Sequence, residues 1–406
     1  MSGTVLLVGA LDTKGVEYSF VKDLIEAAGL RTLVVDFGVM GEPAFAPDVS
    51  RGEVAAAAGG DLAYLASGTH KDEAMRTMAE GLASVVERLY GEGRFDGILA
   101  MGGSGGTSLA TTAMRTLPVG VPKVMVSTVG GGDVSAYAGS KDITFMPSVV
   151  DVAGINRLSR AIYANAAGAI AGMVQTETEA AAHERPLIAA SMFGNTTAAV
   201  DHARGLLESE GYEVLVFHAT GSGGRTMEDL IGADYIAGCL DITTTELADE
   251  ICGGVFSAGP ERVQAAPRQG IPTVIVPGCV DMANFGGIET VPEHYRERTL
   301  YEWNPEVTLL RTNEEENRQM GAMLAAAANA GSPGEVAVLI PLKGVSMLDS
   351  EGDRFWDPAA DGACFDALKN DLRADIPLIE MDANINDPEF AEQAVKLLLG
   401  MLRDEQ

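Results

Sequence analysis

One pattern constrains the fold of this chain more than any other. A short run of β-branched and aliphatic residues is followed by a polar or Gly-rich loop and then by a helical stretch, and this order repeats. In the first half, apolar residues recur at helical spacing over residues 16–28 and 73–90. Apolar runs that predict strands lie at residues 5–8, 30–35, 95–101, 121–127 and 143–146. Strands alternating with helices predict an α/β fold with a mostly parallel sheet.

The alternation pauses after a long predicted helix, residues 151–174, and restarts at residue 187. Residues 176–186 between them are acidic and Ala-rich and end in Pro186, which is typical of a domain boundary. Further strands are predicted at residues 187–192, 213–218, 235–240, 273–276, 307–310, 336–341 and 377–380. A length of 406 residues suits two domains. We therefore predict two Rossmann-like domains, residues 1–180 and 186–406, each a mostly parallel sheet flanked by helices.

The charge balance narrows the classes of function. The chain has 28 Lys and Arg against 58 Asp and Glu, a formal net charge of −30. Binding of nucleic acid by phosphate neutralisation needs a basic face, and docking on an anionic membrane needs basic residues as well, so we expect neither partner. The four cysteines form no C-x-x-C pair, and the most apolar stretch, residues 161–174, is too short to span a bilayer. These features predict a cytoplasmic protein.

In parallel sheets, ligands bind outside the carboxyl ends of the strands, so the residues that follow each strand are the candidates. The first strand is followed by Asp12, Thr13 and Lys14. Lys14 is expected near a helix N-terminus, where the helix dipole already favours anions, and could hold a phosphate. The alternative for this loop is a capped helix with a solvated lysine.

A Gly-rich loop follows the strand predicted at residues 95–101. It comprises Gly102, Gly103, Ser104, Gly105, Gly106 and Thr107. Glycines let backbone amides turn toward a bound oxyanion, and the helix that follows adds partial positive charge. The loop is neither a P-loop nor a dinucleotide motif, but it matches G-x-S-x-G, in which Ser104 would be a nucleophile. Without a histidine clearly placed as its base, we favour a phosphate or carboxylate cradle over a serine nucleophile and over a purely structural turn.

A second Gly-rich loop of the same type follows the strand at residues 121–127. It contains Ser127, Thr128, Gly130, Gly131 and Gly132. Two such loops after strands of one sheet are a more specific signal than either alone. Acidic residues at or near strand ends, which could serve hydrated Mg²⁺ around a polyphosphate, are Asp12, Asp36, Asp133, Asp241 and Asp281. No catalytic residue and no metal ligand can be assigned from these patterns.

In the second half of the chain, polar residues again follow the predicted strands. Residues after its strands that could face a second small ligand, in a cleft between the domains, are Asn195, Thr196, His218, Asp241 and Glu246. A single histidine at a strand end is more often structural than catalytic. Thr243 and Glu246 also have the spacing of a helix capping box, which would explain them without a ligand.

Ten blocks of the chain resemble one known family, the Tm-1-like ATP-binding domain family, formerly UPF0261. They run from about residue 5 to about residue 350: GALDTKGVE, AMGGSGGTSLAT, VSTV with GDV, GINRLSRAIYANAAGAIAGMV, SMFGNTTAAV, FHATGSGGRTMEDL, DITTTELADEICGG, VPGCVDMANFG, LRTNEEEN and PLKGVSMLD. The resemblance implies two Rossmann-like domains, with ATP bound by the first. Gly130 and Gly131 depart from the family pattern, which has Ala and Ser there.

The resemblance also sets expectations about partners. We expect ATP, accompanied by Mg²⁺, as cofactor and a homodimer as the assembly, because a plant member binds ATP and a viral replication protein and forms dimers. Family members often carry a further C-terminal TIM-barrel-like domain, which we expect this chain to lack. Two other functions remain open at this point: a metabolic enzyme, hydrolase or lyase, acting on a small carboxylate or sugar acid, and a protein-interaction module.

Overall fold

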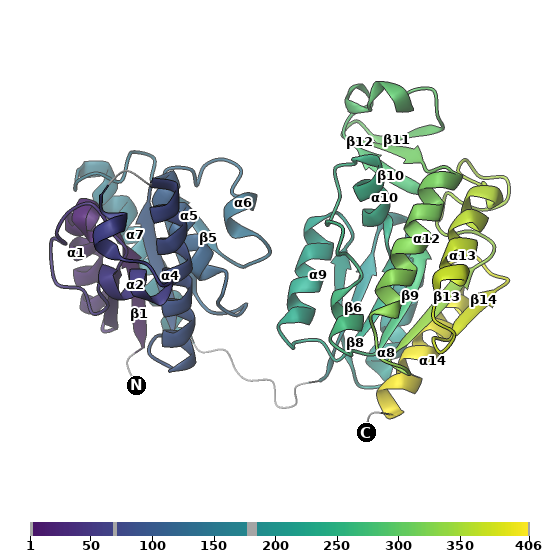
Figure 1. The fold of residues 1–406 in the computed structure, drawn as a ribbon, viewed down its shortest axis with the longest axis horizontal. Coiled ribbons are helices and arrows are strands. Elements are labelled where there is room, and N and C mark those ends of the chain that lie inside the picture. Colours follow the sequence, from purple (N-terminus) through teal and green to yellow (C-terminus); the bar gives the residue numbers. More distant parts are fainter. Residues whose placement is uncertain (1–2, 68–70, 177–184, 405–406) are drawn as a thin grey trace. The chain divides into compact units, whose positions relative to one another are not determined.

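The computed structural model describes residues 3–67, 71–176 and 185–404. The chain divides into two compact units, Met1–Ala180 and Ala181–Gln406 (Figure 1), here called unit 1 and unit 2. The boundary segment expected at residues 176–186 falls mainly on 177–184, outside the described residues. Both units are α/β with a parallel sheet flanked by helices, so the predicted fold class is confirmed.

Unit 1 is built on a five-stranded sheet in the order β2-β1-β3-β4-β5, and every neighbouring pair is parallel. The strands are β1 Thr4–Gly9, β2 Arg31–Asp36, β3 Gly97–Gly102, β4 Lys123–Ser127 and β5 Thr144–Pro147. The central strands β1 and β3 are buried along their whole length, as expected for a parallel sheet covered on both faces.

Successive residues of β1 face opposite sides of the sheet. The helices of unit 1 accordingly form two layers, one on each face. Val5 and Leu7 pack with α1 Leu11–Ala27 and α7 Arg157–Gln175. Leu6 and Val8 pack with α2 Arg51–Ala57, α4 Lys71–Gly91 and α5 Ser104–Met114. Two one-turn helices, α3 Leu62–Leu65 and α6 Ser135–Ala138, complete the unit. Helix α7 begins later than predicted because the Asn156 side chain caps it, accepting from the amides of Leu158 and Ser159.

Unit 2 has a six-stranded parallel sheet in the order β14-β13-β9-β8-β6-β7. Its strands are β6 Leu187–Met192, β7 Glu213–His218, β8 Gly238–Thr243, β9 Thr273–Gly278, β13 Val336–Pro341 and β14 Leu378–Met381. One face is covered by α8 Thr197–Ser209 and α14 Pro388–Asp404. The other is covered by α9 Ser222–Gly232, α10 Thr245–Cys252, α11 Ala265–Arg268, α12 Glu314–Asn329 and α13 Pro358–Asp371.

A second, antiparallel sheet in unit 2 was not predicted. It comprises β10 Met282–Phe285, β11 Leu300–Asn304 and β12 Val307–Arg311 in the order β10-β12-β11. The run at residues 307–310, predicted as one more strand of the repeating alternation, therefore belongs to this smaller sheet. Short 3-10 turns lie at Gly194–Thr196, Ile288–Thr290 and Glu293–Tyr295.

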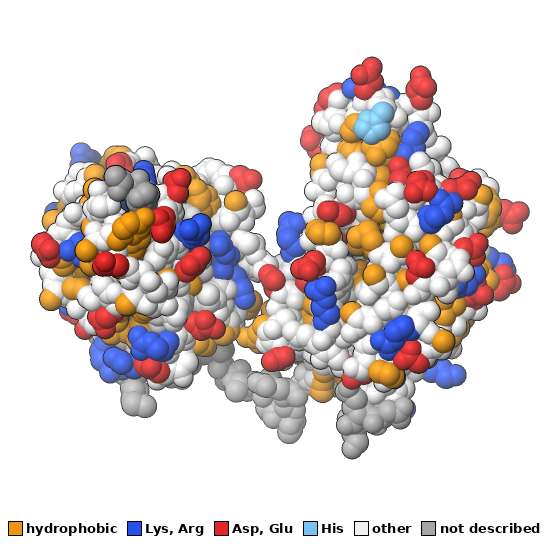
Figure 2. Space-filling model, viewed as in Figure 1, with side chains coloured by type: hydrophobic (Ala, Val, Ile, Leu, Met, Phe, Trp, Pro, Cys, Tyr) orange, Lys and Arg blue, Asp and Glu red, His pale blue; other side chains and the backbone are white. Residues whose placement is uncertain are grey.

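The two parallel sheets share one winding. In each unit the second strand lies outside the first, and the third returns to the other side of the first, giving β2-β1-β3 and β7-β6-β8. At such a reversal the two crossovers leave on opposite faces, which opens a crevice at the carboxyl edge of the sheet. On the face drawn in Figure 2, acidic side chains are spread over the surface of each unit, and basic side chains are interspersed among them. None of the helices described is both long and apolar enough to cross a membrane.

Candidate nucleotide site

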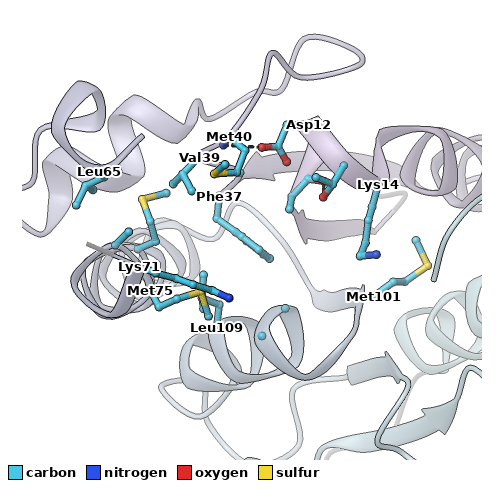
Figure 3. Close-up of a pocket in the computed structure, with 17 residues that line it drawn as sticks. Asp12, Lys14, Phe37, Val39, Met40, Leu65, Lys71, Met75, Met101 and Leu109 are labelled. Atoms are coloured by element: carbon cyan, nitrogen blue, oxygen red, sulfur yellow. Dashed lines mark hydrogen bonds between the residues drawn. The ribbon is translucent and has the colours of Figure 1, made fainter. Parts of the chain in front are cut away.

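A cavity of about 490 Å³ lies at the carboxyl edge of unit 1, where β1 and β3 end (Figure 3). Its walls come from the start of α1, the loop after β2, the helices α3 and α4, and the start of α5. The residues that line it are Ala10, Asp12, Thr13, Lys14, Phe37, Gly38, Val39, Met40, Leu65, Lys71, Ala74, Met75, Met78, Met101, Gly105, Gly106 and Leu109. It therefore occupies the crevice that the strand order creates.

One wall of the cavity is the N-terminus of α5. Strand β3 ends at Gly102, the helix begins at Ser104, and the first intrahelical bond runs from the Thr107 amide to the Gly103 carbonyl, at 2.8 Å. The amides before it, including those of Gly105 and Gly106, belong to the helix end that carries partial positive charge. Gly102 allows this sharp turn, because a Cβ there would lie 3.1 Å from the Gly106 Cα. The arrangement can hold an anion.

Two lysines bring full positive charge to the cavity. Lys14, in the first turn of α1, donates a hydrogen bond to the Val152 carbonyl and has further N–H groups to offer. Lys71 lies exposed at the start of α4, and in Figure 3 the two lysines stand on opposite sides of Phe37. Sequence reasoning missed Lys71 because it follows no strand.

Two buried or half-buried carboxylates shape the loop after β2. Asp12 accepts hydrogen bonds from the amides of Met40 and Gly41, at 2.8 and 3.0 Å. Asp36 accepts from those of Leu11 and Gly38, at 3.0 and 2.8 Å, and burial raises the pKa of this carboxyl. The second oxygen of each carboxylate is buried and has no partner within the described chain. Asp12 lines the cavity, whereas Asp36 lies beneath it and holds α1 and the loop together.

The remaining wall is apolar and rich in methionine. Figure 3 shows Val39, Met40, Leu65, Met75 and Leu109 on one side of Phe37, with Lys14 and Met101 on the other. Thioethers are polarisable and make favourable contacts with aromatic rings. Sequence reasoning missed this wall because it searched polar residues at strand ends. The available signal was the apolar stripe of α4, in which Ala74 and Met78 are buried at helical spacing.

The second Gly-rich loop is hydrogen-bonded to the first. The hydroxyls of Thr107 and Ser127 are buried and hydrogen-bonded to each other, at 2.6 Å, and Ser127 also accepts from the Val129 amide. The Thr128 amide donates to the Gly102 carbonyl. Of the residues predicted to bind nucleotide, those that line the cavity are Asp12, Thr13, Lys14, Gly105 and Gly106. Those that do not line it are Asp36, Gly102, Gly103, Ser104, Thr107, Ser127, Thr128, Gly130, Gly131 and Gly132.

In unit 2, two predicted cleft residues are engaged in a buried ion cluster. Arg262 forms a bidentate pair with Asp241, at 2.5 and 2.7 Å, and binds Glu246 at 2.6 Å. Glu246 also accepts from the amides of Gly221 and Gly224, at the start of α9. The capping box with Thr243 does not form, because Glu246 is committed to Arg262. Asp241 and Glu246 are therefore buried residues that hold β8, α9 and α10 in place.

The other three predicted cleft residues lie at the ends of β6 and β7. Thr196 is buried and its hydroxyl is hydrogen-bonded to that of Thr243, at 2.7 Å. Asn195 and His218 line a separate cavity of about 190 Å³ inside unit 2. The structure thus brings these two together, and leaves Thr196 behind them in the interior.

The acidic residues expected near Mg²⁺ do not converge. Within the described parts of the chain, no three His, Cys, Asp or Glu side chains are arranged to hold a metal ion. Asp281 instead belongs to a buried cluster with Asp349, Asp361 and Arg311, in which Arg311 pairs with Asp361 at 2.7 Å. Burial raises the pKa of Asp281 to about 7 and that of Asp361 to about 8.

Comparisons with known proteins agree with the two-unit fold. The N-terminal domain model of the uncharacterised protein family UPF0261 matches residues 3–179, and its C-terminal domain model matches residues 185–402. The chain belongs to the UPF0261 family. A UPF0261 protein of Clostridium tetani is 49% identical over 403 residues, covering 99% of this chain and all of its own length. The resemblance to this family is therefore confirmed.

A plant protein is similar to this chain over part of the plant protein's length. The tomato protein named ToMV susceptible protein tm-1(GCR26) is 40% identical over 340 residues, which are 82% of this chain and 45% of the tomato protein. Among solved structures, a UDP-N-acetylglucosamine 2-epimerase from Rickettsia bellii covers 68% of this chain and 79% of its own, with 10% identity and a TM-score of 0.25, too low to carry an argument.

One expectation about UPF0261 is not supported. We expected the chain to lack the family's C-terminal, TIM-barrel-like domain. The model of the family's C-terminal domain matches residues 185–402, and that region is unit 2 with its open six-stranded parallel sheet. The expectation that the chain lacks a C-terminal domain of the family is therefore not borne out.

Proposed function

We propose that this UPF0261 protein binds ATP in the unit 1 cavity. The observation that carries the proposal is the composition of that one cavity. It joins a helix N-terminus and two lysines to an apolar, methionine-rich wall at the reversal of a parallel sheet. A nucleotide has the same division, with an anionic phosphate end and a flat, largely apolar ring. The cavity volume of about 490 Å³ is in the usual range for small-ligand sites.

The chemistry of the walls orients the nucleotide. The phosphates would lie at the start of α5, where Gly105 and Gly106 allow a close approach and the helix dipole favours negative charge. Lys14 and Lys71 would supply charge that backbone amides lack. The ring would contact Met75 and Leu109 on the apolar side. Mg²⁺ would be held mainly by the phosphates and water, as is usual for this ion in nucleotide sites, and Asp12 is the carboxylate in the cavity lining.

The alternative occupant of the α5 end is a small carboxylate or sugar acid. Such a ligand would use the helix N-terminus and the lysines in the same way. It would leave the methionine-rich wall without a partner, because a polar sugar gains nothing from a thioether surface. We therefore place ATP first. We also propose that the protein is cytoplasmic and that it forms a homodimer.

A thermal-shift panel tests this proposal against the alternative. ATP, ADP, AMP, adenosine and GTP are compared with citrate, glucuronate and gluconate, each with and without MgCl₂. A ligand at about a hundred times its Kd stabilises the folded protein by roughly 2.7 kcal/mol. We expect ATP to raise the melting temperature, and the sugar acids to leave it unchanged. Stabilisation by an acid without stabilisation by any adenine nucleotide would refute the proposal.

A further inference from the structure

Unit 2 contains an aromatic cavity that the proposed function does not use. It has a volume of about 190 Å³ and lies where β6 and β7 end, beside the antiparallel strands β11 and β12. Its lining includes Phe193, Gly194, Asn195, His218, Phe256 and Trp303. The Phe193 ring meets His218 and Phe256 edge to face, with centroids 5.5 and 6.3 Å apart. Four flat rings, those of Phe193, His218, Phe256 and Trp303, thus form part of the walls.

Asn195 gives this cavity its unusual feature. The residue is 2% exposed, and its Oδ1 is buried with no partner among the described residues. Its Nδ2 donates to the thioether sulfur of Met282 at 3.2 Å, a weak acceptor. Exchanging the amide oxygen and nitrogen would leave both groups unsatisfied, because a thioether sulfur accepts hydrogen bonds and cannot donate one. A buried amide in this state destabilises the fold unless something satisfies it.

The backbone holds Asn195 in this position. Its carbonyl accepts from the Met347 amide at 3.1 Å and from the Asn386 side chain at 2.9 Å. The unsatisfied amide therefore does not arise from a loose loop. It is fixed at the carboxyl edge of β6, beside the strand-order reversal at which sheets of this winding bind ligands.

We propose that this cavity binds a small, uncharged, planar heteroaromatic ring that carries a hydrogen-bond donor beside an acceptor. Phe193, Phe256 and Trp303 would contact the faces and edges of the ring. The Asn195 side chain would rotate its buried amide toward the cavity on binding and pair with the polar edge of the ring. A volume of about 190 Å³ accommodates one or two fused rings and is too small for a whole nucleotide. The site is distinct from the unit 1 cavity and does not depend on ATP binding there.

Tryptophan fluorescence reports on this cavity directly. The chain has two tryptophans, Trp303 and Trp356, so a Trp356→Phe background leaves Trp303 as the sole reporter. The probes are nicotinamide, uracil and adenine. Cyclohexanecarboxamide, which has the amide edge without the aromatic ring, and toluene, which has the ring without the edge, are the controls. We expect saturable quenching by at least one probe and by neither control.

Two variants in the same background locate the binding. Asn195→Leu should weaken the probe by about tenfold or more, and should leave the melting temperature unchanged or higher, because it removes an unpaired buried amide. Gly194→Leu should block the cavity, since a Cβ there faces Trp303 at 3.9 Å without backbone strain. Gly205→Leu is the matched control on α8, where a Cβ meets open space.

The outcomes separate cleanly. Saturable quenching that is lost in Gly194→Leu and kept in Gly205→Leu supports the site. If Asn195→Leu fails to fold, Gly194→Leu decides alone. The proposal is overturned if no probe quenches Trp303 saturably, if toluene binds as well as the probes, or if Asn195→Leu folds and keeps the affinity of the parent.

Discussion

At the scale of single residues, Lys14 combines two contacts. Its ammonium group donates to the Val152 carbonyl, which ties the start of α1 to the loop before α7, and it also lines the unit 1 cavity. The protein has a net charge of −30, so ATP approaches against an unfavourable overall field. A local positive charge beside the phosphates is then needed.

Lys14→Ala should weaken ATP more than adenosine, because adenosine has no phosphate to lose. The expected loss for ATP is roughly 1.5–3 kcal/mol, the range for a hydrogen bond to a charged group, and it should shrink in high salt. Calorimetry with both ligands checks this. Lys22→Ala, which removes a lysine paired with Glu26 on α1, is the control. Equal weakening of ATP and adenosine would mean that Lys14 only shapes the cavity.

Ser104 stands at the first position of α5 and is exposed, although its G-x-S-x-G context would allow a nucleophile. We predict that it is a hydrogen-bond donor only. Ser104→Ala should weaken ATP by about 1 kcal/mol, the value of one neutral hydrogen bond. A fluorophosphonate probe should leave the serine unmodified, as mass spectrometry of the treated protein would show. Covalent labelling at Ser104 would favour the hydrolase alternative.

Sequence patterns identified part of the lining of the unit 1 cavity and missed the rest. The strand-end rule singled out Lys14, Gly105 and Gly106, which the structure places around one cavity. It missed Lys71 and the methionine-rich wall, which come from helices and the loop after β2. It also misplaced Asp241, because its partner Arg262 lies beyond the next helix, where no local pattern announces an ion pair.

At the scale of elements, segments that follow different strands of unit 2 meet at the carboxyl edge of its parallel sheet, and their charged side chains are buried there. The ends of β9, β12 and β13 bring Asp281, Arg311 and Asp349 together. Burial, with Asp349 nearby, raises the pKa of Asp281 to about 7, while Ser346 donates to one of its oxygens at 2.8 Å. A carboxyl whose pKa is raised on folding stabilises the folded state while it stays protonated.

Unit 2 should therefore lose stability as the pH rises from about 4, the ordinary carboxyl pKa, through about 7. Asp281→Asn mimics the protonated form and should flatten this loss, being more stable than the parent at pH 8 and similar to it only below about pH 4. Denaturant unfolding followed by tryptophan fluorescence measures it, because Trp303 and Trp356 both lie in unit 2. Asp353→Asn, at an exposed position, is the control. An unchanged pH profile in Asp281→Asn would contradict the assignment.

At the scale of the whole molecule, both parallel sheets were predictable because their strands are continuous apolar runs separated by loops and helices. The antiparallel strands were not, because β10 and β11 are short and only partly apolar. β11 and β12 form a tight hairpin, in which Asn304 pairs with Val307, but the pairing of β10 with β12 joins residues distant in the chain. The strand order, which creates the crevice in each unit, also lies beyond any local pattern.

A homodimer remains a prediction at this scale. Helix α7 exposes a stripe of small residues, Ala161, Ala164, Gly168 and Gly172, suited to close packing of a second copy. Light scattering should give about twice the 42.3 kDa chain mass, and Gly168→Arg should give the chain mass itself. Gly205→Arg on α8 is the control. A parent protein that stays at 42.3 kDa across micromolar concentrations would reject the dimer.

The central claim is that ATP phosphates lie at the N-terminus of α5, and calorimetry of Gly105→Val tests it most directly. A Cβ at Gly105 would meet only the flexible end of Met75, at 3.4 Å, so the variant should fold while its side chain enters the space a phosphate needs. We predict that Gly105→Val melts like the parent and binds no ATP, whereas Gly205→Val binds ATP normally. Parent-like ATP affinity in a folded Gly105→Val protein would contradict the account.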